Sequence, residues 1–398
     1  MKTAIVNIGT ILSGDLATPV LAGDALLLEN GKISAIGTLS AVEVETADVV
    51  IDADGTIAAP GLIDSHVHIT FGDYTPRQKT VGYLESYTHG GVTSSVSASE
   101  VHVPGRPKDP EGVKALAVAA MKSFEHFRPG GMRVHAGAVI LEPGLTAKDM
   151  VELRQLGVRY AKAGFGAFAT PFDYAPIIAA AREAGLITMA HTGGASIPGS
   201  AGIWAEHILA MRPHVSFHVN GGPIAMPEAG FQCLIEESDV ALQLCTAGNL
   251  RTALLVAKLA EKTGNLSRLL VATDTPTGSG IMPLGILYTL SHLCALGGMD
   301  PEIAFATACG NNARVFGLNS GIIAKGRDAD IILLDACAGG SQPDALSALR
   351  NGDIPAICAV ITDAVPRFVG RSRNTPAGIR NVRTASSRII NLFEGNAH

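Results

Sequence analysis

The chain has 398 residues, of which 47% are hydrophobic and 17% are charged, and its mean hydropathy is +0.28. This composition is typical of a compact enzyme with a large buried core and excludes a disordered chain. The formal net charge of −6 argues against a nucleic-acid partner, and no apolar run is long enough to span a membrane. The first residues lack a signal-peptide pattern and the six cysteines lack CxxC spacing, so we expect a cytoplasmic protein with free thiols.

Both ends of the chain show the pattern of short strands and turns. Residues 1–58 include ALLLENGKISAIG, with a hairpin signal at Asn30-Gly31, and no helix-period pattern. Similar runs return after residue 320, in GIIAKGRDADIILLDA and AICAVITDAVPRFVG. We therefore predict a small composite β-sandwich domain formed by residues 1–58 and 321–375, followed by an extended arm over residues 376–398.

The middle of the chain, residues 59–320, alternates strand and helix patterns. Eight segments have strand character, and helical segments lie between them, several ending in glycine. The expected strands are LIDSHVHI, GVTSSVSAS, MRVHAGAVIL, GVRYAKAG, LITMAH, VSFHV, VALQLC and RLLVATD. This alternation predicts an α/β fold, specifically a (β/α)₈ TIM barrel with its chemistry at the carboxyl ends of the strands.

The first expected strand carries two histidines, His66 and His68, within GLIDSHVHI. Residues i and i+2 of a strand lie on the same face, so both imidazoles can point to one place and form half of a metal site. An arbitrary HxH is more often an accidental surface pair. Here the strand is apolar, Asp64 precedes the pair, and Pro60-Gly61 marks a sharp entry, which together favour metal binding.

Four further polar residues stand at the ends of other expected strands: Lys162, His191, His218 and Asp274. A barrel brings the carboxyl ends of its strands to one rim. A single histidine at a strand end usually has a packing role. Two of them, each followed closely by a Gly-Gly turn and accompanied by Asp274, indicate one site.

The run PGLIDSHVH and this set of strand-end residues resemble the amidohydrolase superfamily of binuclear metal-dependent hydrolases. The resemblance covers almost the whole chain. It implies that His66, His68 and Asp274 hold the more buried metal and that His191 and His218 hold the more exposed one. It also implies that Lys162 joins the two as a carboxylated lysine; the alternative is a salt-bridged lysine beneath the loops. Two zinc ions are expected, with Fe²⁺ or Mn²⁺ as replacements, and the family suggests a homo-oligomer, a tetramer.

Longer phrases resemble the branch of the superfamily that opens cyclic enamides. They are GDYTPRQKT, HGGVT, GRPKD, VHAGAVILEPGLT, HTGGASIPGS, HVNGGP and IMPLGIL. The members of that branch supply a glutamate at the bridging position, and Lys162 departs from their pattern.

These features together predict a hydrolase that opens the C–N bond of a small cyclic amide or enamide bearing a carboxylate. A hydroxide bridging the metals is the expected nucleophile, with Asp274 as proton shuttle. The arginine fork of Arg77 is expected to bind the carboxylate. The other expected substrate contacts are Lys79, His102, Arg106, Thr192 and Asn220.

Three alternatives remain on the same scaffold. The first is a hydrolase of other cyclic amides or imides, like dihydroorotase or hydantoinase. The second is a heterocycle deaminase, which usually needs one metal and a further acid; no such glutamate accompanies His191, which lies near Met189 and Thr192. The third is a non-enzymatic assembly protein, which the six filled ligand positions disfavour.

Overall fold

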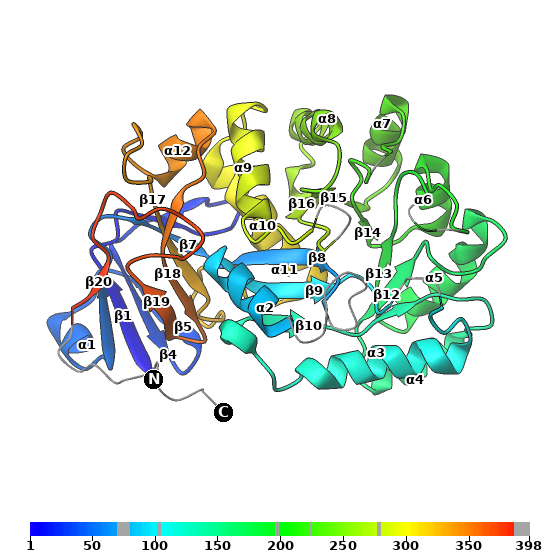
Figure 1. Ribbon diagram of the computed structural model, residues 1–398, viewed down its shortest axis with the longest axis horizontal. Coiled ribbons are helices and arrows are strands. Elements are labelled where there is room, and N and C mark those ends of the chain that lie inside the picture. The colour runs from blue at the N-terminus through cyan, green and yellow to red at the C-terminus, as the bar shows by residue number, and fades with distance from the viewer. Residues whose placement is uncertain are drawn as a thin grey trace.

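Two groups of strands divide the computed structural model, one rich in antiparallel pairs and one entirely parallel (Figure 1). The structure describes residues 1–69, 80–101, 105–195, 197, 199–222, 224–276 and 280–385. Across these residues, no helix combines the length and the apolar character that crossing a bilayer requires.

The antiparallel group contains strands from both ends of the chain in each of its two sheets, with orders β20-β6-β1-β4-β5 and β19-β18-β17-β7-β2-β3. One apolar cluster joins the sheets, with Ile5 and Leu28 from the first and Leu333 and Ile361 from the second. The strands are β1 (Lys2–Val6), β2 (Thr10–Leu12), β3 (Val20–Leu21), β4 (Ala25–Glu29), β5 (Lys32–Gly37), β6 (Val49–Asp52), β7 (Ile57–Pro60), β17 (Ile331–Asp335), β18 (Ala356–Thr362), β19 (Val365–Val369) and β20 (Arg383–Thr384).

Two details of this group differ from the sequence expectation. The expectation of strands and turns alone in residues 1–58 was wrong, because α1 (Ala41–Glu45) is a helix. Its five residues are too few to show a period, and it is stabilised by a capping box between Ser40 and Glu43. Part of the expected terminal arm also joins the sheets, since β20 pairs with β6. A second short helix, α12 (Ala345–Asn351), precedes β18.

The parallel group occupies the eight strand positions expected in the middle of the chain. They are β8 (Leu62–Val67), β9 (Val92–Ser97), β10 (Arg133–His135) with β11 (Ala138–Ile140), β12 (Tyr160–Ala163), β13 (Ile187–Ala190), β14 (Val215–Ser216), β15 (Ala241–Cys245) and β16 (Leu269–Ala272). The third expected strand is divided into β10 and β11 at Gly137, whose φ is 96°. A Cβ there would lie 2.8 Å from the carbonyl oxygen of Ala117, so the break requires glycine.

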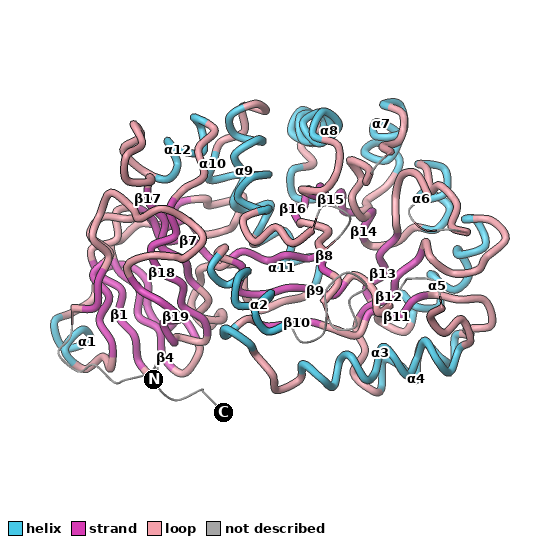
Figure 2. Tube along the Cα trace, in the orientation of Figure 1, coloured by secondary structure: helices cyan, strands magenta, loops and turns pink. Residues whose placement is uncertain are grey.

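Helices alternate with these strands and lie outside them, as the cyan and magenta segments of Figure 2 show. Helix α3 begins where Asp109 caps it and Pro110 fills its first position, and it buries Val113, Ala117, Ala120 and Phe124. The helices are α2 (Thr80–His89), α3 (Pro110–Phe124), α4 (Ala147–Gln155), α5 (Ala175–Glu183), α6 (Ala205–Met211), α7 (Glu228–Glu237), α8 (Leu250–Lys262), α9 (Gly285–Ala295), α10 (Pro301–Ala308) and α11 (Gly310–Phe316), with 3₁₀ turns η2 (Pro129–Gly131), η3 (Pro171–Tyr174) and η4 (Leu266–Arg268).

The parallel strands form two sheets in the described residues, with orders β10-β9-β8 and β11-β12-β13-β14-β15-β16. The two sheets approach at both margins. The amide of His68 donates to the carbonyl of Thr275 at 2.9 Å, and the amide of Glu100 donates to the carbonyl of Ala138 at 3.3 Å. One apolar cluster takes side chains from every strand position: Ile63, Val96, Ala138, Tyr160, Met189, Val215, Ala241 and Leu270. The α/β class is confirmed, and closure into one eight-stranded barrel stays a prediction.

Candidate metal centre

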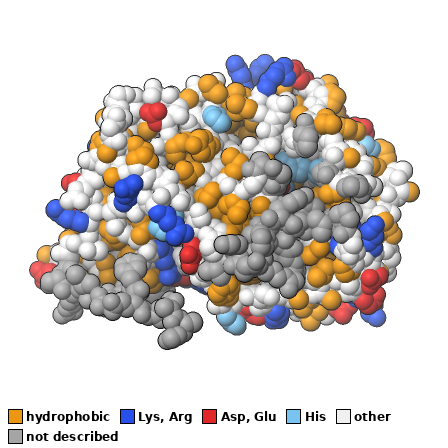
Figure 3. All heavy atoms as spheres, viewed as in Figure 1, with side chains coloured by type: hydrophobic (Ala, Val, Ile, Leu, Met, Phe, Trp, Pro, Cys, Tyr) orange, Lys and Arg blue, Asp and Glu red, His pale blue; other side chains and the backbone are white. Residues whose placement is uncertain are grey.

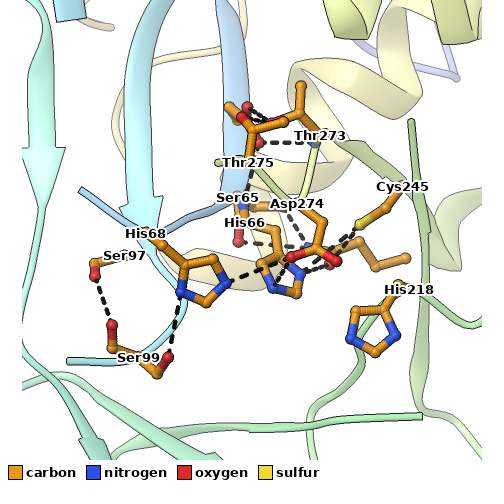
Figure 4. Close-up of polar contacts among 12 residues, drawn as sticks. Ser65, His66, His68, Ser97, Ser99, His218, Cys245, Thr273, Asp274 and Thr275 are labelled. Atoms are coloured by element: carbon orange, nitrogen blue, oxygen red, sulfur yellow. Dashed lines mark hydrogen bonds and ion pairs between the residues drawn. The ribbon is translucent and has the colours of Figure 1, made fainter. Parts of the chain in front are cut away.

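His66, His68 and Asp274 converge at the carboxyl ends of β8 and β16 (Figure 4). Asp274 Oδ1 lies 3.0 Å from His66 Nε2 and 3.4 Å from His68 Nε2. One ligand atom of each residue lies within 4.8 Å of the other two. Both histidines are buried, and pale-blue histidine side chains are visible in the hollow of the face shown in Figure 3. The strand alternation therefore placed the two imidazoles together as predicted.

A glutamine fixes the protonation of His66. Gln243, on β15, donates from Nε2 to Ser65 Oγ at 2.8 Å, so its Oε1 faces the imidazole as an acceptor. His66 Nδ1 lies 2.9 Å from that oxygen and donates to it, which leaves the lone pair on Nε2. Sequence reasoning missed Gln243, although a single amide inside the apolar run ALQLC was a usable signal.

The two remaining histidines are oriented by backbone carbonyls. His191 Nε2 donates to the carbonyl of Gly194 at 2.7 Å, and His191 Nδ1 is buried without a partner among the described residues. His218 Nδ1 donates to the carbonyl of Thr192 at 2.9 Å, which leaves its Nε2 unprotonated. The two ring centroids lie 4.6 Å apart, and His218 lies 5.3 Å from His66.

Burial keeps these imidazoles neutral. Loss of solvation lowers the pKa of His66 and lowers that of His218 well below its usual value, and it lowers the pKa of His191 to about 4. A neutral imidazole with a free ring nitrogen is the form that ligates a metal. His66, His191 and His218 therefore offer unprotonated nitrogens from three strand ends.

Lys162 points into the same interior from β12. Its side chain is fully buried, and its Nζ has no hydrogen-bond partner among the described residues. The Nζ lies 4.1 Å from the ring centroid of Phe217, and the ring centroids of Phe217 and His66 are also 4.1 Å apart. Burial lowers the pKa of Lys162 to about 7. No ion pair supports the alternative of a salt-bridged lysine within the described part of the chain.

Asp274 is held in place by a second carboxylate, Asp64. Asp64 accepts hydrogen bonds from the amides of Thr273 at 3.0 Å and His66 at 3.2 Å, which links β8 to the segment carrying Asp274. Burial raises the pKa of Asp64 to about 7. Burial also acts to raise the pKa of Asp274, but His66 and the contact with His68 hold it well below its usual range. Asp274 is therefore the ionised carboxylate of the site.

These donors fit a divalent metal pair. The interior holds four imidazoles, the carboxylate of Asp274 and the amine of Lys162. Two of its buried atoms, His191 Nδ1 and Lys162 Nζ, lack partners in the described residues. Buried polar atoms without partners are rare in folded proteins, and mixed nitrogen and oxygen donors suit zinc and its neighbours.

Three expected substrate contacts, Arg77, Lys79 and His102, lie outside the described residues. Arg106 is described, and it is buried and engaged by the protein. Its guanidinium forms an ion pair with Glu142 and donates to the carbonyl of Phe165 at 2.5 Å. These contacts fix the loop that follows β12, where Phe165 packs against His191, and the role of Arg106 as a substrate contact stays a prediction.

The side chains of Thr192 and Asn220 also form hydrogen bonds with neighbouring groups of the protein. The hydroxyl of Thr192 lies 2.6 Å from that of Ser216. Asn220 Oδ1 accepts from the amide of Cys245 at 2.9 Å, and its Nδ2 donates to the carbonyl of the same residue at 3.1 Å. Both side chains fasten the segments that carry His191 and His218, because loop conformation rather than sequence proximity sets their direction. The prediction that they also bind the ring stays a prediction.

Comparison with known proteins adds an independent line of support. The model of the amidohydrolase family matches residues 57–375. Enamidase of Eubacterium barkeri is 43% identical over 380 residues, covering 95% of this chain and 98% of that protein. A crystal structure of enamidase superposes with a TM-score of 0.91 at 42% identity, covering 96% of this chain and all of that chain, 100%. Adenine deaminase 2 of Desulfotalea psychrophila is 27% identical over 341 residues, which covers 80% of this chain but 52% of that protein.

Proposed function

Because the chain belongs to the amidohydrolase family, we propose that it is a metal-dependent hydrolase that opens the ring C–N bond of a small cyclic enamide or lactam bearing a carboxylate. The observation that carries this proposal is the convergence of unprotonated histidine nitrogens, Asp274 and the unpaired Lys162 at one set of strand ends. The similarity to enamidase over nearly the full length of both chains supports a hydrolase of cyclic amide C–N bonds.

The proposed metal assignment takes the pattern of the amidohydrolase family, and the group of His66, His68 and Asp274 supports its first part. His66, His68 and Asp274 would hold one divalent cation, and His191 and His218 would hold the second, with a carboxylated Lys162 as the bridge. Zinc is the proposed metal, with Fe²⁺ or Mn²⁺ as replacements. When bound, such cations polarise a carbonyl and make a water molecule more acidic.

Asp274 is the proposed proton carrier. Its Oδ1 faces the imidazoles of His66 and His68, which leaves Oδ2 to accept a proton from the attacking water and return it to the departing ring nitrogen. Asp64 holds the segment that carries this carboxylate, through hydrogen bonds to Thr273. The Arg106–Glu142 ion pair holds the loop of Phe165 beside His191.

The same proposal includes finer features. Closure of the parallel strands into a (β/α)₈ barrel is supported by the apolar cluster that draws on all eight strand positions. A composite terminal domain with the bounds 1–58 and 321–375 is supported by the mixed membership of both antiparallel sheets. A cytoplasmic location agrees with free cysteines at all six positions. A homotetramer, and a carboxylate bound by Arg77, are further parts of the proposal.

Ring opening can be tested with substrates that separate hydrolysis from deamination. The metal-loaded enzyme is incubated with a six-membered unsaturated lactam bearing a ring carboxylate, with its saturated analogue, and with an aminopyrimidine. We expect the lactams to gain the elements of water with loss of the ring, as followed by mass spectrometry. Exchange of the exocyclic amine for oxygen, with both lactams untouched, would instead identify a deaminase.

A further inference from the structure

A second cavity lies at the opposite ends of the parallel strands. It has a volume of about 190 Å³ and is lined by Met121, Phe124, Glu125, Arg128, Arg133, Val134, His135, Ala136, Gly157, Arg159 and Tyr160. Arg133 is the first residue of β10 and Arg159 directly precedes β12, so the cavity lies at the amino ends of these strands. His191 and Asp274 follow the carboxyl ends of β13 and β16. The cavity is therefore separate from the candidate metal centre.

Three buried polar atoms on the cavity residues have no hydrogen-bond partner within the described part of the chain. They are Arg133 Nε, His135 Nε2 and Tyr160 Oη. Tyr160 is 1% exposed, so its hydroxyl is shielded from bulk solvent. Each unpaired buried polar group costs free energy, and three on the walls of one cavity indicate a polar ligand there.

The charges around the cavity are positive. Arg128 pairs with Asp363, and Arg133 pairs with Asp328 and Asp363. Glu125, which also lines the cavity, forms an ion pair with Lys122, whose Nζ lies 2.9 Å from Glu125 Oε2. Arg159 has no ion pair among the described residues.

Instead, Arg159 Nη2 donates to the carbonyls of Phe316 at 3.0 Å and Gly317 at 3.1 Å. Its guanidinium charge therefore remains available to an anion. The pKa of His135 is consistent with a positive cavity. It is lowered to about 3, mainly by burial and further by the charges of Arg159, Arg133 and Arg128.

The remaining walls are apolar, formed by Met121, Phe124 and Val134. The volume exceeds the roughly 150 Å³ of a cavity that accepts benzene. We propose that this cavity binds a small oxyanion, a phosphate or the carboxylate of a ring-sized acid, through Arg159, Arg133 and Tyr160. Asp328 precedes β17 and Asp363 lies in the turn between β18 and β19, so the ligand would sit beside the ion pairs that join the parallel strands to the antiparallel sheets.

The test measures binding to the metal-loaded enzyme by calorimetry, with inorganic phosphate and benzoate as probes and chloride at equal ionic strength as reference. We expect saturable binding of at least one probe, and the tighter of the two identifies the source of the anion. Arg159→Met should weaken binding by tenfold or more, because it removes a charge-assisted contact.

Tyr160→Phe provides a variant that keeps the fold. The hydroxyl has no partner within the described residues, so the variant should unfold at the same temperature as the native protein, or a higher one, in the absence of the probe, yet bind it about threefold to tenfold more weakly. Arg251→Met, at an exposed position on α8, removes the same charge elsewhere and should bind like the native protein. Equal binding by the native protein, Arg159→Met and Tyr160→Phe would overturn the proposal, as would saturable binding of neither probe.

Discussion

The two ends of the parallel strands leave different kinds of atoms without partners. At the carboxyl ends, the atoms without a hydrogen-bond partner in the described part of the chain include His191 Nδ1 and Lys162 Nζ, beside an ionised carboxylate. At the amino ends, arginines surround an unpaired N–H of Arg133 and an unpaired hydroxyl of Tyr160. The first arrangement suits a cation and the second an anion. The charge of a ligand is thus indicated by which atoms the fold leaves unpaired.

The largest expected effect is at the carboxyl ends, from Asp274→Asn. Loss of a positioned proton carrier lowers turnover by about 10²–10⁴-fold, and loss of a ligand adds to that. We expect at least a hundredfold fall in kcat with an unchanged unfolding temperature. Asp353→Asn, at an exposed position, is the matched control. A fall of less than tenfold would place the proton carrier elsewhere.

Lys162→Met should remove one of two bound metals and most of the activity. The thioether side chain fills the space beside Phe217, while the amine that would form the bridge is lost. Without metal, the variant should be at least as stable as the native protein, because an unpaired buried amine is replaced by an apolar group. Lys258→Met, exposed on α8, serves as control for metal content and melting temperature. A variant that still binds two metals would show that Lys162 is no bridge.

Gln243→Leu should weaken metal binding by about 10–100-fold, the range typical of partners that orient a ligand. The substitution removes the oxygen that accepts from His66 Nδ1 and so frees the imidazole to adopt the other tautomer. Competition with a chromogenic chelator measures the affinity. Gln243→Glu keeps an acceptor and should recover part of it, whereas Gln232→Leu, exposed on α7, should have no effect. Unchanged affinity in Gln243→Leu would mean that His66 is oriented without it.

The smallest expected effect is on the pH dependence of folding stability, through His135 at the amino ends of the parallel strands. The pKa of His135 falls from 6.5 to about 3 on folding. Between these values the unfolded chain binds a proton that the folded chain does not, so the native protein loses stability as pH falls through this window. One proton changes the folding equilibrium constant by at most about tenfold per pH unit. His135→Gln should therefore lose less stability than the native protein between pH 6.5 and 5 in oxyanion-free buffer. If the stabilities of the native protein and His135→Gln fell equally with pH, His135 would not be buried in its neutral form beside Arg128, Arg133 and Arg159.

The convergence of the candidate metal ligands could be predicted from the sequence because local geometry decides their place. Strand alternation directs His66 and His68 to one side, and parallel strands carry His191, His218 and Asp274 to one edge. Contacts between side chains on different strands could not be predicted from the sequence. Gln243 reaches His66 only because of the neighbour and register of β15, which no local pattern encodes.

The direction of side chains in loops could not be predicted from the sequence either. Thr192 and Asn220 stand one and two residues after the candidate ligands His191 and His218, and their side chains contact Ser216 and Cys245. The cavity at the amino ends was also missed. It depends on arginines brought together from separate segments.

Metal stoichiometry tests the central claim most directly. The purified protein is depleted with a chelator, titrated with Zn²⁺, freed of excess ion and analysed for metal per chain. The arrangement of His66, His68 and Asp274 on one side and His191, His218 and Lys162 on the other predicts saturation at two ions per chain, with activity returning as the second site fills. Saturation at one ion with full activity, or binding of none, would contradict a binuclear hydrolase.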